Sequence, residues 1–84
     1  MVRLLFFHAD WCGQCRMVEP IIRSLEGVEF VDMDISDDVD SAKAYNVSTL
    51  PTVILEVSGE EKARIVGARS KAFYQKEIES VKEG

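Results

Sequence analysis

Residues 10–16 read DWCGQCR, and this stretch holds Cys12 and Cys15, the only cysteines of the chain. The preceding segment 3–9, RLLFFHA, is almost continuously apolar, as expected for a strand that is buried on both faces. After the pair, apolar residues recur with helical spacing at Met17, Val18, Ile21, Ile22 and Leu25. We therefore expect the two thiols where a strand ends and a helix begins.

Three further segments have the composition of strands: 28–35, 51–57 and 62–68. The last two flank the turn sequence SGEE at 58–61, which predicts an antiparallel hairpin. Gly27 is expected to stop the first helix. Serines are expected to cap two later helices, one running from Ser36 to about Tyr45 and one starting after Ser70.

The expected element order is β-α-β-α-β-β-α. The first strand, helix and strand should form a parallel pair with a right-handed crossover, and the hairpin adds antiparallel strands. The predicted fold class is therefore α/β, with a four-stranded mixed sheet flanked by helices. At 84 residues, the chain is expected to form one domain over 1–84.

Charge and hydropathy exclude two classes of partner. The net charge is −5 and no cluster of Lys or Arg is present, which argues against nucleic-acid binding. No apolar run reaches the length of a membrane-spanning helix, so no membrane partner is expected. The first eleven residues lack a small-residue cleavage site, and we expect a cytoplasmic location.

The spacing of the cysteines favours a bond that is made and broken. A disulfide between them closes a very small loop, which constrains the unfolded chain little. The start of a helix favours negative charge, so Cys12 is expected to supply the thiolate nucleophile. Cys15 lies one turn on and can displace a product bonded to Cys12. Gly13 and Gln14 shape the turn between them and should tune its reduction potential.

A metal site is the alternative interpretation, because C-x-x-C is also half of many zinc sites. Such a site needs two more ligands, but the chain has no third cysteine and only one histidine, His8. The neighbouring Asp10 is too close along the chain to complete a tetrahedron easily. We therefore expect no metal, and a metal-binding or redox-sensing module remains the less favoured hypothesis.

The segment WCGQC at the start of the first helix, together with STLPT at the start of the next-to-last strand, resembles the thioredoxin family. The family pattern is W-C-G-P-C, followed by a cis-proline next to a threonine. AYNVSTLPT, the hairpin residue Gly59 and the segment VGARS at 66–70 extend the resemblance over essentially the whole chain.

The resemblance implies a thioredoxin-like fold and a protein dithiol–disulfide oxidoreductase. Such a protein works as a monomer, binds no cofactor and uses the Cys12–Cys15 pair as a redox-active disulfide. Its electrons come from a thioredoxin reductase or a similar donor, and its clients are proteins with exposed disulfides.

The resemblance also implies residue roles. Cys12 attacks and Cys15 resolves. Pro51 is cis, and Leu50 offers its backbone to an extended substrate peptide. The expected lining of the apolar groove beside the sulfurs is Trp11, Gly67 and Ala68.

The chain departs from the family pattern in its layout. It starts at the strand that leads to the cysteines, which is the shorter arrangement of glutaredoxins, so a glutathione-dependent glutaredoxin is the closest competing hypothesis. Glutaredoxins typically have a Gly-Gly and a polar or acidic pair after the hairpin, whereas VGARS is thioredoxin-like. Gln14 stands in place of the family's proline and indicates a less reducing couple.

A second departure concerns proton transfer. Phe6 occupies the position of a buried family aspartate, and His8 replaces a common tryptophan. Our hypothesis is that His8, or Asp32 on the neighbouring strand, takes over part of the proton handling. The alternative is that His8 only packs under the helix and that water moves the proton.

Overall fold

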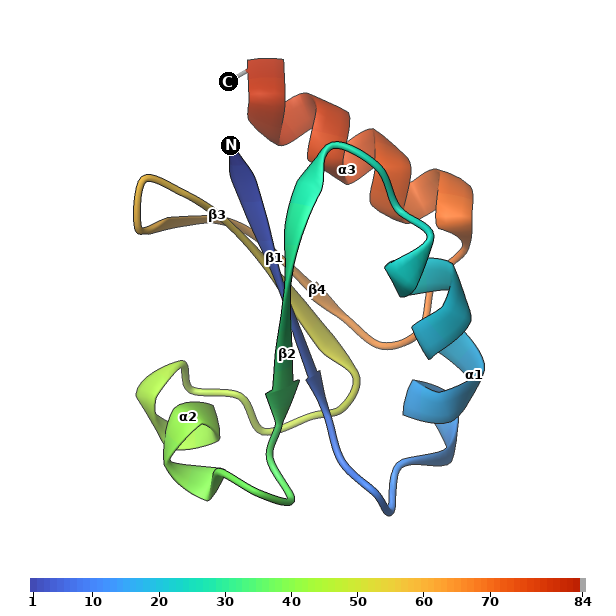
Figure 1. The fold of residues 1–84 in the computed structure, drawn as a ribbon, viewed down its shortest axis with the longest axis vertical. Helices are drawn as coiled ribbons and strands as arrows, with labels where there is room; N and C mark the ends of the chain where they lie inside the picture. The colour runs from blue at the N-terminus through green and yellow to red at the C-terminus, as the bar shows by residue number, and fades with distance from the viewer. Residues whose placement is uncertain (84) are drawn as a thin grey trace.

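The computed structural model describes residues 1–83 and contains the predicted order of elements (Figure 1). The strands and helices are β1 Val2–His8, α1 Gly13–Arg23, β2 Val28–Asp34, α2 Val39–Ala44, β3 Thr52–Val57, β4 Glu60–Val66 and α3 Lys71–Glu83. The strands form one sheet in the order β2-β1-β3-β4. β1 is parallel to β2 and antiparallel to β3, which pairs antiparallel with β4. The prediction of a four-stranded mixed sheet flanked by helices is confirmed.

Alternation along the central strand β1 supplies a core on each face of the sheet. Leu4 and Phe6 belong to the larger cluster, to which α1 contributes Val18 and Ile22 and α3 contributes Tyr74 and Ile78. Leu5, Phe7 and Ile54 form the second cluster, against which Tyr45 and Val47 pack after α2. α1 and α3 therefore cover one face of the sheet, and the α2 segment covers the other (Figure 1).

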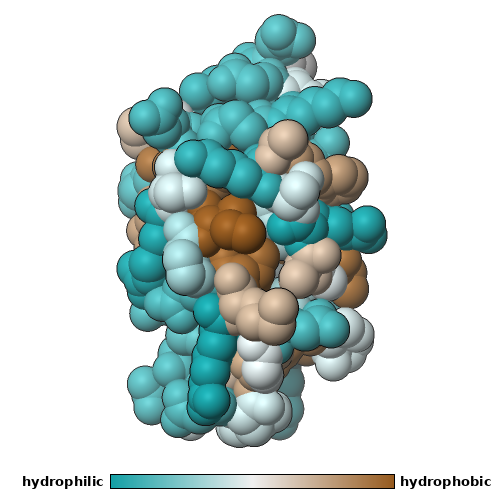
Figure 2. Space-filling view, turned by 90° about the vertical axis from the view of Figure 1, so that its right-hand side faces the viewer, coloured by the Kyte–Doolittle hydropathy of each residue, from teal (hydrophilic) through white to brown (hydrophobic). Residues whose placement is uncertain are grey.

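The outer surface of α1 and α3 is largely hydrophilic. Figure 2 views the molecule from this side and shows a hydrophobic patch near the middle, with smaller hydrophobic areas toward the edges, on a mostly hydrophilic surface. Val18 and Ile22 of α1 are buried against the sheet, whereas Met17 on the same helix is 78% exposed. The predicted apolar stripe is therefore confirmed at Val18 and Ile22 and is wrong at Met17, which lies on the solvent face of the helix.

The predicted start of the second helix at Ser36 is wrong. α2 begins at Val39, and its N-cap is Asp38, whose carboxylate accepts hydrogen bonds from the Ser41 backbone N–H (3.3 Å) and hydroxyl (2.6 Å). These hydrogen bonds lower the pKa of the Asp38 carboxyl. The hydroxyl of Ser36, which a cap would use, instead accepts the N–H of Asp10 at 2.9 Å. The N–H of Ser36 donates to Asp34 Oδ1 (2.9 Å), in a turn closed by an aspartate side chain.

Two other predicted boundaries also move. The first helix ends at Arg23 with Ser24 as its C-cap, before the predicted stop at Gly27. The hairpin turn contains only Ser58 and Gly59, both at positive φ (53° and 81°), so it is tighter than the predicted four residues. The predicted cap of the last helix is confirmed, because the hydroxyl of Ser70 accepts the N–H of Phe73 at 3.1 Å.

Arg64 joins β4 to the end of α2, and its loss should be measurable. Its guanidinium donates to the carbonyl oxygens of Tyr45 (2.7 Å) and Asn46 (3.2 Å), which lie where the helix leaves carbonyls without partners. Arg64→Ala is expected to lower the free energy of unfolding by about 1–2 kcal/mol, as measured by urea denaturation. Arg64→Lys should restore less than half of this, because an ammonium lacks the planar fork.

The control for Arg64 is Lys62→Ala on the same strand. Lys62 pairs with Glu60 only at 3.9 Å, and both side chains are well exposed. Such a pair contributes little to stability, so the variant should stay within about 0.5 kcal/mol of the parent. Equal losses in the two variants would contradict the bridging role of Arg64.

Candidate active site

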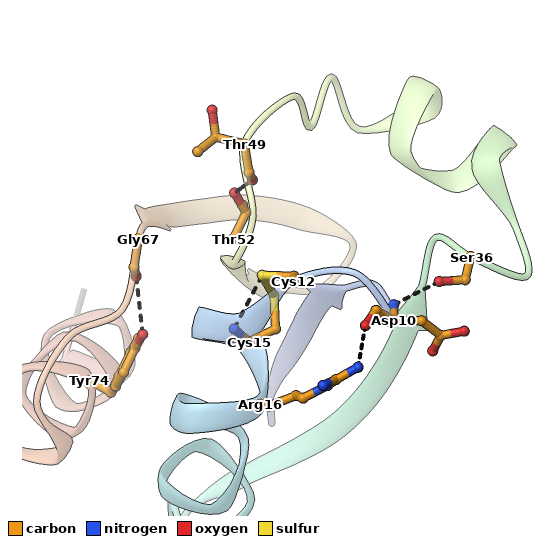
Figure 3. Close-up of a disulfide and its surroundings, with 9 residues drawn as sticks. All are labelled: Asp10, Cys12, Cys15, Arg16, Ser36, Thr49, Thr52, Gly67 and Tyr74. Atoms are coloured by element: carbon orange, nitrogen blue, oxygen red, sulfur yellow. Dashed lines mark hydrogen bonds between the residues drawn. A yellow bond between two sulfur atoms is a disulfide. The ribbon is translucent and has the colours of Figure 1, made fainter.

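The two cysteines form a disulfide at the start of α1, where the sequence places them. Their Cα atoms are 5.3 Å apart. Cys12 is the N-cap of the helix, and its sulfur accepts the backbone N–H of Cys15 at 3.2 Å (Figure 3). Cys15 is buried at 2% exposure, whereas Cys12 is only partly buried. Cys12 is therefore the sulfur that a partner molecule can reach.

The loop that leads into the disulfide is clamped from two sides at Asp10 (Figure 3). The N–H of Asp10 donates to the hydroxyl of Ser36 at 2.9 Å, and Arg16 of α1 donates to the carbonyl of Asp10 at 2.6 Å. Asp10 thus finds side-chain partners for both backbone groups. The guanidinium of Arg16 thus connects the loop to α1, and the hydroxyl of Ser36 connects it to the segment after β2.

A groove of about 390 Å³ opens beside the disulfide. Its lining residues are Trp11, Cys12, Ile35, Val47, Ser48 and Leu50. The structure therefore brings Trp11 and Leu50 together with Cys12 along one groove. Trp11 is 71% exposed and forms an apolar wall that faces solvent.

Sequence reasoning missed Ile35, Val47 and Ser48 as groove residues. Ile35 follows the end of β2, and Val47 follows α2, so both are apolar residues just outside a regular element. This position in the sequence could have indicated a role in the groove, because an apolar side chain outside a strand or helix is not part of that element's buried face. The polar Ser48 gave no such signal.

Pro51 follows the groove residue Leu50, and the Leu50–Pro51 peptide bond is cis. The N–H of Gly67 donates to the carbonyl of Pro51 at 2.9 Å. The hydroxyl of Thr52 donates to the carbonyl of Thr49 at 2.6 Å and closes the turn before the proline (Figure 3). Gly67 is thus held beside Pro51, but Gly67 and Ala68 are not among the residues that line the groove.

His8 and Asp32, the predicted proton-handling residues, lie in contact. Nε2 of His8 is hydrogen-bonded to Oδ1 of Asp32. The imidazole stacks on the ring of Phe6 with centroids 4.8 Å apart, and Phe6 itself is fully buried. In residues 1–83, the hydrogen bonds of His8 do not include either cysteine sulfur. The structure therefore joins the two residues to each other, beside the buried phenylalanine.

Metal binding and membrane insertion can be assessed for residues 1–83, the part of the chain that the structure describes. Across that range, no set of three or more His, Cys, Asp or Glu side chains is arranged to hold a metal ion. The helices of the same range are all too short or too polar to cross a membrane.

Gly13 and Gln14, the residues expected to tune the reduction potential, are exposed in the first turn of α1, between the two cysteines.

Comparisons with known proteins identify the family. The family model described as thioredoxin matches residues 2–80. Thioredoxin H2 of Arabidopsis thaliana is 40% identical over 74 residues, which make up 83% of this chain and 56% of the relative. A thioredoxin of Chlamydia pneumoniae is also 40% identical over 74 residues, or 83% of this chain and 72% of the relative. The chain thus spans little more than half the length of the plant protein.

Solved structures agree with this assignment. A mutant thioredoxin from Halobacterium salinarum NRC-1 superposes with a TM-score of 0.88 at 34% identity, covering 94% of this chain and 73% of that one. Oxidized mitochondrial thioredoxin 3 from Saccharomyces cerevisiae superposes with a TM-score of 0.82 at 31% identity, covering 94% and 77%. With its cysteine pair at disulfide distance, the chain belongs to the thioredoxin family of thiol–disulfide oxidoreductases.

Proposed function

We propose that this chain reduces disulfides of client proteins by cycling between the Cys12–Cys15 disulfide and the dithiol. One observation carries the proposal: the accessible sulfur of Cys12 lies at the N-terminus of α1 on the wall of a groove, with Cys15 buried behind it. This arrangement separates an attacking thiol from a resolving thiol.

In the first step, the thiolate of Cys12 attacks one sulfur of the client disulfide. A mixed disulfide forms, and the other client sulfur leaves as a thiolate. The N–H of Cys15, 3.2 Å from the Cys12 sulfur, and the start of the helix favour negative charge on Cys12 before the attack.

In the second step, the thiolate of Cys15 attacks the Cys12 sulfur and closes the intramolecular disulfide. The remaining client sulfur is released as a thiolate, so the client has gained two electrons and takes up two protons. A reductase must return two electrons to the Cys12–Cys15 disulfide. The cycle uses no bound cofactor, and we infer a thioredoxin reductase or a similar protein as donor.

The groove supports an extended peptide as the substrate. Trp11, Ile35, Val47 and Leu50 supply apolar walls beside Cys12, which suits an apolar side chain next to the client cysteine. We infer that Leu50 also offers its backbone to the peptide and that Gly67 and Ala68 flank it from the other side. The protein acts as a monomer in a reducing compartment, which we take to be the cytoplasm.

The proposed function is tested by comparing two electron donors. Insulin disulfides are offered with NADPH and thioredoxin reductase, and in parallel with glutathione and glutathione reductase. The account expects NADPH consumption that depends on this chain in the first assay. Turnover in the second assay alone would establish a glutaredoxin and overturn the proposal. Dithiothreitol-driven insulin reduction checks the exchange chemistry independently of any reductase.

The proton-handling role of His8 and Asp32 stays a prediction, supported by their mutual contact. If the pair moves a proton, His8→Ala should change the pH profile of disulfide reduction, because imidazole titrates near neutrality. Asp32→Asn should alter the same limb of the profile. Superimposable profiles would show that His8 only packs on Phe6.

A further inference from the structure

The exposed loop after β4 is anchored by one buried hydroxyl. Tyr74 of α3 is 1% exposed, and its phenol oxygen accepts the N–H of Arg69 at 3.1 Å. The same hydroxyl donates to the carbonyl of Gly67 at 3.3 Å (Figure 3). Burial raises the pKa of the Tyr74 hydroxyl, against a smaller effect of the Arg69 N–H, so the group stays protonated and able to donate at neutral pH.

The hydrogen bonds continue from this loop to the groove. The N–H of Gly67 donates to the carbonyl of Pro51 at 2.9 Å, and Pro51 follows Leu50, a lining residue beside Cys12. Tyr74 is therefore linked to the site by two consecutive hydrogen bonds, one from its hydroxyl to Gly67 and one from Gly67 to Pro51. The ring of Tyr74 is packed in the main core, so its hydroxyl is held at a fixed place.

Side-chain packing contributes little to holding the backbone of the loop at Gly67. Gly67 has a φ of +88°, and a Cβ added there would meet no atom within 4 Å, so side-chain packing does not hold its backbone. Ala68 and Arg69 are exposed. The two hydrogen bonds from the buried Tyr74 hydroxyl to the backbone of Gly67 and Arg69 can therefore fix the position of this exposed loop.

We propose that Tyr74 is a positioning residue for client binding. Its hydroxyl fixes the backbone of Gly67 and Arg69, and Gly67 in turn fixes Pro51, so that a client peptide meets a preformed surface beside Cys12. This inference rests on the proposed function and adds a specificity role to a core residue. Tyr74 touches neither the sulfurs nor the client, so it acts on docking and leaves the exchange step itself unchanged.

Tyr74→Phe is the direct test, because it removes the hydroxyl and keeps the ring. KM for insulin is expected to rise about three- to tenfold at unchanged kcat, because both hydrogen bonds of the hydroxyl are lost and a single such bond already corresponds to a factor of about this size. Reduction of the small disulfide 5,5′-dithiobis(2-nitrobenzoic acid) needs no extended docking, and its rate should stay within about twofold. Amide hydrogen exchange at Gly67 should accelerate by a similar factor to the KM change.

Ser24→Ala is the matched control. It removes a hydroxyl that donates to the carbonyl of Ile21 at 2.7 Å, at the end of α1 away from the disulfide. This variant should lose stability without a change in KM. If Tyr74→Phe leaves KM for insulin within twofold, or slows both substrates equally, the positioning role is refuted. If the parent protein reduces neither substrate, the proposed function itself has failed.

Discussion

Replacing Cys12 with serine is expected to lower the rate of insulin reduction by at least about 10³-fold, because the attacking thiolate is lost. Cys12 is the more accessible sulfur, and it sits at the helix start with the Cys15 N–H directed at it. The measurement is insulin reduction driven by dithiothreitol, corrected for the rate without protein. Retention of more than a tenth of the parent rate would exclude Cys12 as the nucleophile.

Cys15→Ser is the paired variant and should behave differently. Turnover stops, but the attack by Cys12 is preserved, so one client molecule per chain becomes trapped as a mixed disulfide. Cys15 is 2% exposed, which makes it a poor partner for an external disulfide. Trapping by Cys12→Ser together with its absence in Cys15→Ser would mean that the two roles are reversed.

Phe6→Ala is expected to lower the free energy of unfolding by about 3–5 kcal/mol. Phe6 is fully buried on β1 beneath α1, in the same cluster as Cys15, with its ring centroid 6.2 Å from that of Phe30. Domains of this size are stable by only about 4–13 kcal/mol, so the variant loses a large share of its stability. Chemical denaturation of both proteins in the oxidised state measures the difference.

Phe73→Ala provides the control for Phe6. Phe73 is 40% exposed on α3, where Arg69 lies over its ring at 5.2 Å. Folding removes less apolar surface from water at Phe73 than at Phe6. The loss in free energy of unfolding should therefore be less than half of that for Phe6→Ala. A Phe6→Ala loss below about 1 kcal/mol would contradict the placement of this ring in the core.

The order of elements was predictable because each strand and helix carries its own hydrophobic period. Segment 3–9 is almost continuously apolar, and β1 is a central strand with a core on each side. The site was predictable at its chemical centre for a similar local reason. Cys12 and Cys15 are three positions apart at a strand-to-helix junction, so their proximity depends on one turn of helix alone.

The remaining features depend on contacts between distant segments. Asp38 caps α2, whereas the hydroxyl of Ser36 accepts the N–H of Asp10 from the loop after β1, a contact that no local pattern predicts. Ile35 and Val47 reach the groove only once β2 and the α2 segment lie beside the cysteine loop. These positions depend on side chain–backbone hydrogen bonds and on packing between segments that are distant in sequence. The hydrophobic pattern along the sequence does not predict such contacts.

Phe6 and His8 show how the chain departs from its family at the site. The position expected to hold a buried acid is a fully buried phenylalanine, and His8 stacks on it while bonding to Asp32. Arg23 of α1 also approaches Asp32 at 3.9 Å. The titratable groups nearest to Phe6 therefore form a small polar network at the edge of β2, in place of one buried carboxyl beneath the disulfide.

The central claim is that Cys12 attacks a client disulfide and Cys15 resolves the product. The most direct measurement incubates reduced Cys15→Ser protein with a short peptide disulfide and determines the site of the adduct by mass spectrometry of proteolytic fragments. The account predicts one peptide per chain, attached to Cys12 and released by dithiothreitol. An unmodified Cys12 after complete exposure to the peptide disulfide would contradict it.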